Sequence, residues 1–474
     1  MYDINKQYRC DIIRGKSQSQ LEDLLPAYAK VINDICPLPK KEFDKKFNEN
    51  LISYLPTTAR DEKTLKNHRT EIAGQLFGMY VHGADDIIYC SDRTKKFLAD
   101  GDIPAFFKDI CYKMQFPNVM QKQKTVEQRL FDGISIRQYC YLISVLEEAE
   151  KRNIYLTKKE VGVYVLNSLD ALKRNATPTE IVDLLEKDRQ TKKFRDIQNE
   201  KESSWNWQHI NEQINYLELA NLVYIDGKKT LYLNHKENET LSLFSKEWNS
   251  SPLFLITKED VSNSENFKKL QLRWYSYYGS LSNVEKAFTT KIEALSVETN
   301  SEGGYRAYGN TVELGDEGEK FVFNYEKTRV GKYNPRLVNK VILFGKQKGL
   351  GYDIQSVMAV KKIGNNEYPE MGKYIEVKAT RRVTAPKIDD SEWYDSVNIT
   401  RNEWVAAKEK QDSYFIYRVF FTRTGVFIYT MQNPCQKNED DKLSVIPLTY
   451  RIEISKKSVD DVIDIKIENG GENA

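Results

Sequence analysis

The sequence has 474 residues and a nearly balanced charge, with 71 Lys and Arg against 69 Asp and Glu and a formal net charge of +2. This length predicts about three domains, and a hydrophobic content of 40% excludes a disordered chain. The charge balance excludes a uniformly basic nucleic-acid binder, although local basic patches remain compatible with it. The sequence has no secretory signal and no apolar run that could span a bilayer, so we expect a cytoplasmic protein without membrane contact.

Residues 1–130 read as a mainly helical N-terminal lobe. A helical apolar spacing over residues 64–79 is followed by a strand-like run at 85–90 and a capped helix start at 91–98. This order is typical of a winged-helix unit that recognises DNA, and an ordinary helical lobe explains it about as well. The DNA-binding candidates share the start of the first of these helices and have the chemistry to contact bases and phosphates: Lys63, Lys66, Asn67 and Arg69. A solvated helix face is the alternative.

Residues 131–255 predict a second lobe, built of helices and a further winged-helix unit. Thr157 precedes Glu160 with the spacing of a capping box at a helix start, and Thr177 is expected to begin another helix with Pro178 at its first position. Asp226 and the glycine after it separate two β-rich runs, which predicts a hairpin behind the helix. A hairpin that simply closes a helical domain fits equally well. Residues 256–304 predict a helical linker.

Residues 305–474 differ in character, because strand-like runs and turns become frequent there. We therefore expect a separate α/β domain. Residues 374–380 alternate apolar with charged side chains, and the charged ones are Glu376 and Lys378. In a strand this alternation places the apolar side chains under a helix and the two charged side chains together on the opposite face. Asp353 stands at the start of another strand-like run, which predicts a second carboxylate near this pair.

Two carboxylates beside a lysine suit the hydrolysis of phosphodiesters. Asp353 and Glu376 offer the hard oxygen ligands that Mg²⁺ prefers, and bound Mg²⁺ activates water and neutralises charge on the phosphate. Lys378 can orient or deprotonate the attacking water and stabilise the transition state. The Glu-x-Lys spacing occurs once in the chain. The alternative is a salt bridge on an exposed sheet face.

The preceding segment offers further charged candidates. Glu319 and Glu326 stand seven residues apart on one predicted helix, so either could supply another carboxylate to the metal site. A solvated helix face is the alternative for Glu326. Between residues 329 and 352 there are six basic residues and no acidic one, which predicts a track for a phosphate backbone. The DNA-binding candidates of this patch are Arg329, Lys332 and Arg336.

The C-terminal domain resembles the PD-(D/E)XK nuclease superfamily. The match rests on Asp353, Glu376 and Lys378, with Glu319 on the preceding helix, while Tyr352 replaces the proline that precedes the first Asp in the family. The amino-acid sequence of these segments is also similar to that of a domain often fused to restriction and defence proteins. The resemblance implies that Asp353 and Glu376 are ligands of Mg²⁺ and that Lys378 is the catalytic lysine.

The rest of the chain resembles type IIS restriction and nicking endonucleases, which join a multi-lobed winged-helix part to a C-terminal nuclease. The order of the lobes and the hairpin of residues 222–233 carry this similarity. We therefore expect an α+β multidomain protein, with mainly helical winged-helix lobes ahead of an α/β PD-(D/E)XK core. The implied function is Mg²⁺-dependent, sequence-specific cleavage of double-stranded DNA in a bacterial restriction-modification system.

Two other functions remain open at the level of sequence. One is a nuclease that depends on DNA modification or acts in phage defence, and the other is a DNA-binding subunit or regulator without catalysis. A double-strand break would need self-dimerisation or a partner subunit, because one such centre cuts one strand at a time. The sequence has no Gly-x-x-x-x-Gly-Lys-[Ser/Thr] run, so we expect no requirement for ATP.

Overall fold

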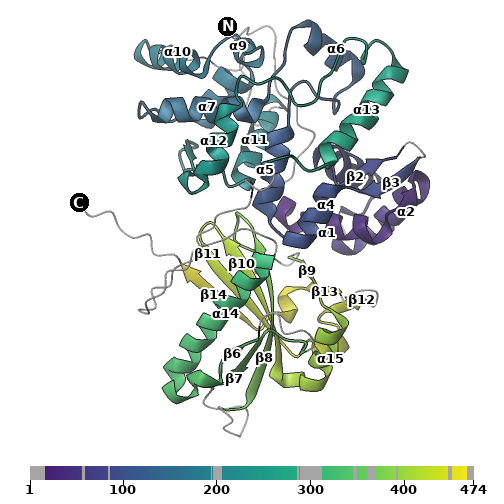
Figure 1. Cartoon of the computed structure of the whole chain (residues 1–474), viewed down its shortest axis with the longest axis vertical. Helices are drawn as coiled ribbons and strands as arrows, with labels where there is room; N and C mark the ends of the chain where they lie inside the picture. The colour runs from purple at the N-terminus through teal and green to yellow at the C-terminus, as the bar shows by residue number, and fades with distance from the viewer. Residues whose placement is uncertain are drawn as a thin grey trace. The chain divides into compact units, whose positions relative to one another are not determined.

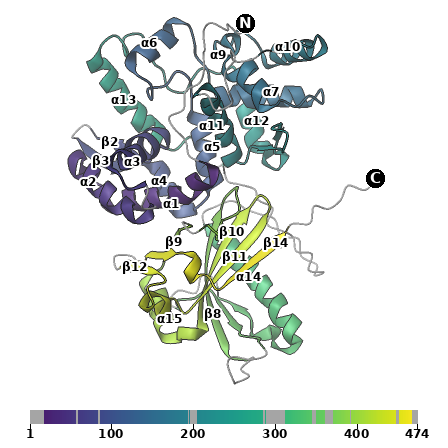
Figure 2. The ribbon, with the colours of Figure 1, turned by 180° about the vertical axis from the view of Figure 1, so that it is seen from behind.

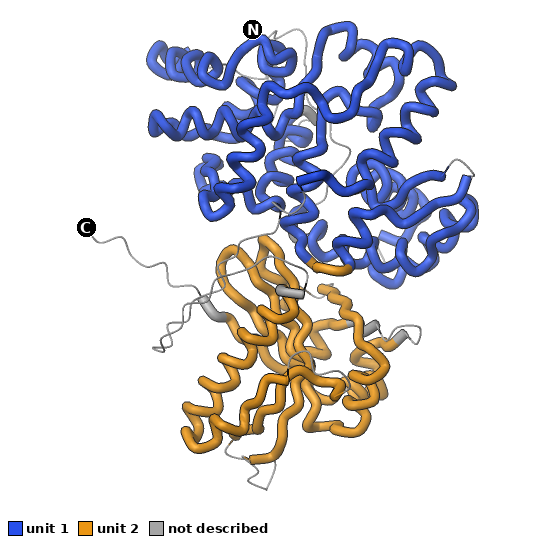
Figure 3. Tube along the Cα trace, in the orientation of Figure 1, with its two compact units in different colours: residues 1–98, 102–291 blue, residues 99–101, 292–474 orange. Residues whose placement is uncertain are grey.

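The computed structural model describes residues 17–55, 59–83, 86–193, 195, 205–284, 288, 312–344, 350–360, 370–390, 393–446 and 451–466. The chain forms two compact units (Figure 3). Unit 1 contains residues 1–98 and 102–291, and unit 2 contains residues 99–101 and 292–474. Residues of both predicted N-terminal lobes and of the predicted linker belong to unit 1, and their division at residues 130 and 255 stays a prediction. The described ranges contain no helix with the length and apolar character needed to cross a membrane.

Helices dominate the part of the chain before residue 291 (Figure 1). The α-helices are α1 (Gln18–Ile35), α2 (Lys40–Leu51), α3 (Glu62–Lys66), α4 (Asp92–Asp100), α5 (Ile103–Lys113), α6 (Gln123–Phe131), α7 (Gln138–Glu150), α8 (Lys158–Glu160), α9 (Leu169–Leu172), α10 (Pro178–Gln190), α11 (Trp205–Leu219), α12 (Asn238–Lys246) and α13 (Ser264–Gly279). Short strands complete it: β1 (Leu38–Pro39), β2 (Tyr80–His82), β3 (Ile87–Cys90), β4 (Val223–Ile225) and β5 (Leu231–Leu233). Strands β1, β3 and β2 form one small sheet, and β4 and β5 form another.

Local sequence signals in unit 1 are confirmed. Thr157 forms the predicted capping box at the start of α8, and α10 begins as predicted after Thr177, with Pro178 at its first position. Strands β4 and β5 form the predicted antiparallel hairpin around Asp226, with Val223 opposite Leu233. These elements are present in the order expected, while their assignment to winged-helix units stays a prediction.

Two predicted helical segments differ in extent from the helices found in the structure. The helix over residues 64–79 begins at Glu62 but is α-helical only through α3, and it continues as the π-helical segment η3 (Asn67–Leu76). It ends before Gly78, whose φ of +58° is incompatible with a continuing helix. In the helical linker predicted for residues 256–304, α13 ends at Gly279 and the backbone is extended at Ser280. Residues 285–287 and 289–304 of this linker lie outside the described residues.

Unit 2 contains the α/β architecture expected for the C-terminal part. Its helices are α14 (Val312–Tyr333), α15 (Arg401–Lys410) and α16 (Pro434–Glu439). Its strands are β6 (Ile342–Leu343), β7 (Ile354–Val357), β8 (Gly372–Arg381), β9 (Asp395–Asn398), β10 (Tyr414–Thr422), β11 (Gly425–Gln432), β12 (Ser444–Ile446), β13 (Arg451–Ile454) and β14 (Asp461–Lys466). Six of them form a mixed sheet in the order β14-β11-β10-β8-β7-β6, in which the central β8 and β10 run parallel.

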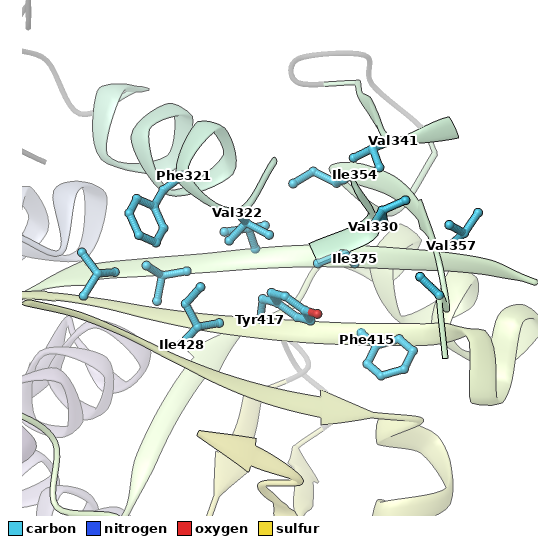
Figure 4. Packing of buried hydrophobic residues seen from close by; sticks show 14 of the residues in the cluster. Phe321, Val322, Val330, Val341, Ile354, Val357, Ile375, Phe415, Tyr417 and Ile428 are labelled. Carbon is cyan, nitrogen blue, oxygen red and sulfur yellow. The ribbon is translucent and has the colours of Figure 1, made fainter. Parts of the chain in front are cut away.

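The two faces of this sheet are covered by different helices (Figures 1 and 2). On one face, Ile375 and Val377 of β8 pack with Val322 and Val330 of α14 in one buried cluster (Figure 4). The apolar side chains of the alternating run at residues 374–380 therefore lie under α14, as predicted. On the other face, the cluster joins residues of α15 to β10, β11 and the small β12-β13-β9 sheet. The PD-(D/E)XK assignment of this core stays a prediction.

Candidate active site

Asp353 is fixed at the entry to β7, beside the central strand β8. Its backbone N–H donates to the carbonyl of Ile375 at 2.9 Å, and its side-chain Oδ2 accepts from the N–H of Val377 at 2.8 Å. The turn before it contains Gly351, with φ of +74°. Both bonds bring the carboxylate to the middle of β8, so Asp353 approaches Glu376 although 22 residues separate them in the chain.

Glu376 and Lys378 lie on the face of β8 opposite to α14. Glu376 is buried, with 3% of its surface exposed. The Lys378 Nζ lies 2.6 Å from Glu376 Oε1, so the two side chains form an ion pair. The structure therefore brings together Asp353, Glu376 and Lys378, three of the four residues predicted to be catalytic, whereas the fourth, Glu319, lies on α14.

Sequence reasoning missed a fourth residue in this group, Glu403. Its Oε2 lies 3.1 Å from Lys378 Nζ. It stands in the first turn of α15 and closes a capping box with Thr400. The Thr-x-x-Glu spacing is visible in the sequence and marks the helix start, but nothing in it indicates a lysine on a distant strand.

Burial and mutual repulsion govern the electrostatics of the site. Burial raises the pKa of Glu376 well above its usual range, and the neighbouring Asp353 raises it further. Burial likewise raises the pKa of Asp353, against the lowering effect of the Val377 amide and of Lys378. Burial alone would lower the pKa of Lys378, but Glu376 and Glu403 outweigh it and raise this pKa. The carboxyl groups of Asp353, Glu376 and Glu403 thus have one ammonium group near them, that of Lys378, so the site has more carboxyl groups than positive charges to balance them.

This donor set fits a divalent cation held by few protein ligands. Among the residues that the structure describes, no group of three or more His, Cys, Asp or Glu side chains is arranged to hold a metal ion. Asp353 raises the pKa of the neighbouring Glu376 carboxyl group, and a cation beside these two carboxyl groups would offset this effect. Mg²⁺ is commonly bound through one or two carboxylates, with water and phosphate oxygens as its other ligands.

Glu319 and Glu326 lie on α14, which packs on the opposite face of β8. For Glu319 the role of a further carboxylate stays a prediction. Glu326 is fully buried and accepts hydrogen bonds from Ser356 at 2.6 Å and from Tyr417 at 2.9 Å. It also forms a bidentate pair with Arg329. Both interpretations of Glu326 are therefore wrong, because it belongs neither to the metal site nor to a solvated face.

The candidate DNA-binding residues have different environments. Lys63 and Lys66 on α3 are exposed, as are Lys332 and Arg336 near the end of α14, and Asn67 is half-buried. Two arginines instead have their donors engaged inside the protein, which counts against the contacts with DNA predicted for them. Arg329 binds Glu326 and the carbonyls of Val357 and Met358. Arg69 is buried and binds Asp44 at 2.9 Å.

Two family models match the chain, one in each unit. The model described as "Restriction endonuclease BpuJI - N terminal" matches residues 2–275, more than half of the chain. The model described as "Protein NO VEIN, C-terminal" matches residues 318–430, which include Asp353, Glu376, Lys378 and Glu403. No curated protein matches the sequence.

A solved structure is similar to the N-terminal part. It is the crystal structure of pyrene- and phenanthrene-modified DNA in complex with the BpuJ1 endonuclease binding domain. The two chains are 44% identical, with a TM-score of 0.56, and the match covers 59% of this chain and 100% of the other. Because the family model matches more than half of the chain and the solved relative is 44% identical, the chain belongs to the BpuJI N-terminal restriction endonuclease family.

Proposed function

We propose that this protein is a Mg²⁺-dependent endonuclease that binds double-stranded DNA through unit 1 and hydrolyses a phosphodiester bond in unit 2. The observation that carries the proposal is the cluster of Asp353, Glu376 and Lys378 in a chain of a restriction endonuclease family. A sheet with a purely structural role does not require a buried and a half-buried carboxyl group beside a lysine within contact distance on one face. Their presence supports chemistry at this point.

Similarity to a domain that binds DNA supports the assignment of unit 1. The solved relative is in complex with DNA, and its whole length aligns with this chain at 44% identity. The exposed Lys63 and Lys66 are available to contact phosphate or base edges, and we propose that they do so. In unit 2, the exposed Lys332 and Arg336 are proposed to contact the DNA backbone near the cleaved bond.

The residues of unit 2 have distinct proposed roles. Asp353 and Glu376 hold Mg²⁺, which when bound supplies a Lewis acid and lowers the pKa of a coordinated water. Lys378 stays protonated because two carboxylates raise its pKa. We therefore assign it to stabilising the negative charge that builds on the phosphate oxygens, rather than to removing a proton from water.

The test separates binding from cleavage in the full chain. Supercoiled plasmid DNA, in unmodified and methylated forms, is incubated with wild type, Glu376→Gln and Lys378→Met, with Mg²⁺ or with EDTA. We expect wild type with Mg²⁺ to give nicked or linear product and to give none with EDTA. Both variants should lose cleavage by about 10²-fold or more while they retain DNA affinity in a gel-shift assay.

Lys408→Met is the matched control, because Lys408 is an exposed lysine on α15. It should cleave like wild type. Discrete fragments would establish sequence specificity, and cleavage of methylated DNA alone would indicate a modification-dependent nuclease. Wild type that binds both plasmids and cleaves neither would contradict the proposal and favour a binding subunit without catalysis.

A further inference from the structure

We propose that Glu403 is a positioning residue of the nuclease centre, whose carboxylate holds the Lys378 ammonium beside Glu376. This inference rests on the proposed function of unit 2. It assigns Glu403 a role through Lys378 rather than a contact with the substrate.

The geometry around Lys378 is the first support. Its Nζ lies 2.6 Å from Glu376 Oε1 and 3.1 Å from Glu403 Oε2, so two carboxylates from different elements hold it. An ammonium has three N–H donors, and two of them are thereby engaged. The Lys378 side chain is 23% exposed, whereas Glu403 is 14% exposed. The third donor thus belongs to a lysine that is partly exposed to solvent.

The first turn of α15 fixes the position of the Glu403 carboxylate. Glu403 Oε2 accepts a hydrogen bond from the N–H of Thr400 at 2.9 Å, and the Thr400 hydroxyl accepts from the N–H of Glu403 at 3.3 Å. The same Oε2 contacts Lys378. Because the capping box restricts the Glu403 rotamer, this oxygen is already in place before any substrate binds.

A close packing contact holds α15 against the turn that carries Asp353. A Cβ at Gly351 would lie 2.6 Å from the carbonyl oxygen of Asn402 and 2.7 Å from Cβ of Ala406. The carbonyl of Gly351 also accepts a hydrogen bond from the Tyr414 hydroxyl at 2.8 Å. Only a glycine allows this approach, so the helix that supplies Glu403 and the turn that supplies Asp353 are fixed relative to each other.

A role in capping alone is the competing explanation, and it makes a different prediction. A capping box accepts Gln at this position as well as Glu, because only an oxygen acceptor is required. Glu403→Gln therefore keeps the cap and removes the charge that binds Lys378. Thr400→Ala does the reverse, because it removes the capping hydroxyl and leaves the carboxylate in place.

The experiment uses the full chain with supercoiled plasmid DNA and Mg²⁺, and measures the single-turnover cleavage rate, the DNA affinity and the Tm. We expect Glu403→Gln to lower the cleavage rate by roughly tenfold or more, with DNA affinity and Tm unchanged. Thr400→Ala should lower the Tm and reduce the rate less than Glu403→Gln does. Glu409→Gln, an exposed glutamate of the same helix, is the matched control and should equal wild type in all three measurements.

Two results would overturn the inference while wild type still cleaves. One is a Glu403→Gln variant that cleaves at the wild-type rate, and the other is a rate loss that follows the Tm across the variants. Failure of wild type to cleave would instead refute the proposed function, and the inference with it.

Discussion

Two lysines of the same strand show how the surroundings of a side chain decide its chemistry. Lys373 and Lys378 lie on opposite faces of β8, because their positions in the strand differ by five, an odd number. Lys373 is buried under α14, where it contacts the Tyr417 hydroxyl and lies 3.6 Å from Glu326. Burial lowers the pKa of Lys373 to about 8. For Lys378 the neighbouring carboxylates outweigh burial, and its pKa is raised.

The depressed pKa of Lys373 makes the stability of the protein depend on pH. Its pKa is about 8 in the folded chain against an ordinary value of 10.5, so between these values the unfolded chain binds more protons. The free energy of unfolding should therefore rise with pH in this window, by up to about 1.4 kcal/mol per pH unit. Urea unfolding of wild type and Lys373→Met at pH 7.5 and pH 9.5 measures the effect (roughly these values, below and inside the window).

The stability difference between wild type and Lys373→Met is the informative quantity, because other groups titrate equally in both. We expect this difference to shift in favour of wild type as the pH rises. Lys408→Met, at an exposed position of α15, is the control and should show no such shift. A difference between wild type and Lys373→Met that is independent of pH would refute the assignment.

At this scale the sequence predicted the placement of the acidic residues and Lys378 better than the surroundings of the basic residues. The Glu-x-Lys alternation is a local pattern, and it placed Glu376 and Lys378 on one face of a strand. The hydrogen bonds of the half-buried Arg329 depend on Glu326 and on the carbonyls of Val357 and Met358, which lie 28 and 29 residues away, and no local pattern contains that information. Glu403 was missed for the same reason, because its partner Lys378 lies on another element.

Among the elements, α14 depends on a close approach to β8. A Cβ at Gly318 would lie 2.6 Å from Cβ of Ala379, which is closer than two such atoms pack. A Cβ at Gly315, three residues earlier on the same helix, would meet nothing within 4 Å. Substitutions at these two glycines therefore test two properties of α14 separately: its packing against the sheet at Gly318 and its intrinsic helix propensity at Gly315.

We expect opposite effects from the two substitutions. Gly318→Ala should destabilise the protein by about 1–3 kcal/mol, because α14 must move away from the sheet. Gly315→Ala should stabilise it by about 0.5–1 kcal/mol, because alanine is the better helix former. Urea unfolding of the full chain measures both changes. Equal effects of the two substitutions would show that the close contact at Gly318 does not govern the packing of α14.

Elements with local signals were predicted well. The capping box at Thr157, the helix start at Thr177 and the hairpin around Asp226 follow from short-range hydrogen bonds and turn chemistry, and the structure contains all three. The order of the six strands was not predictable in the same way. It depends on pairing between segments far apart in the chain, such as the parallel register of β8 and β10.

At the scale of the whole molecule, we expect unit 1 to bind DNA and unit 2 to cleave it. The family match of residues 2–275 lies within the N-terminal unit, and the Asp353, Glu376 and Lys378 cluster lies in the C-terminal one. A fragment of residues 1–291 should bind plasmid DNA with an affinity near that of the full chain and should not cleave it. A gel-shift titration of fragment and full chain tests this. Loss of binding in a folded fragment would show that unit 2 is needed for recognition.

The most direct test of the central claim compares wild type with Glu376→Gln in the cleavage of supercoiled plasmid DNA in the presence of Mg²⁺. The substitution keeps the size of a buried side chain and removes one proposed metal ligand. The account predicts nicked or linear product from wild type and intact supercoiled DNA from a Glu376→Gln variant that binds the plasmid equally well. Equal cleavage by both proteins would contradict a nuclease centre on β8.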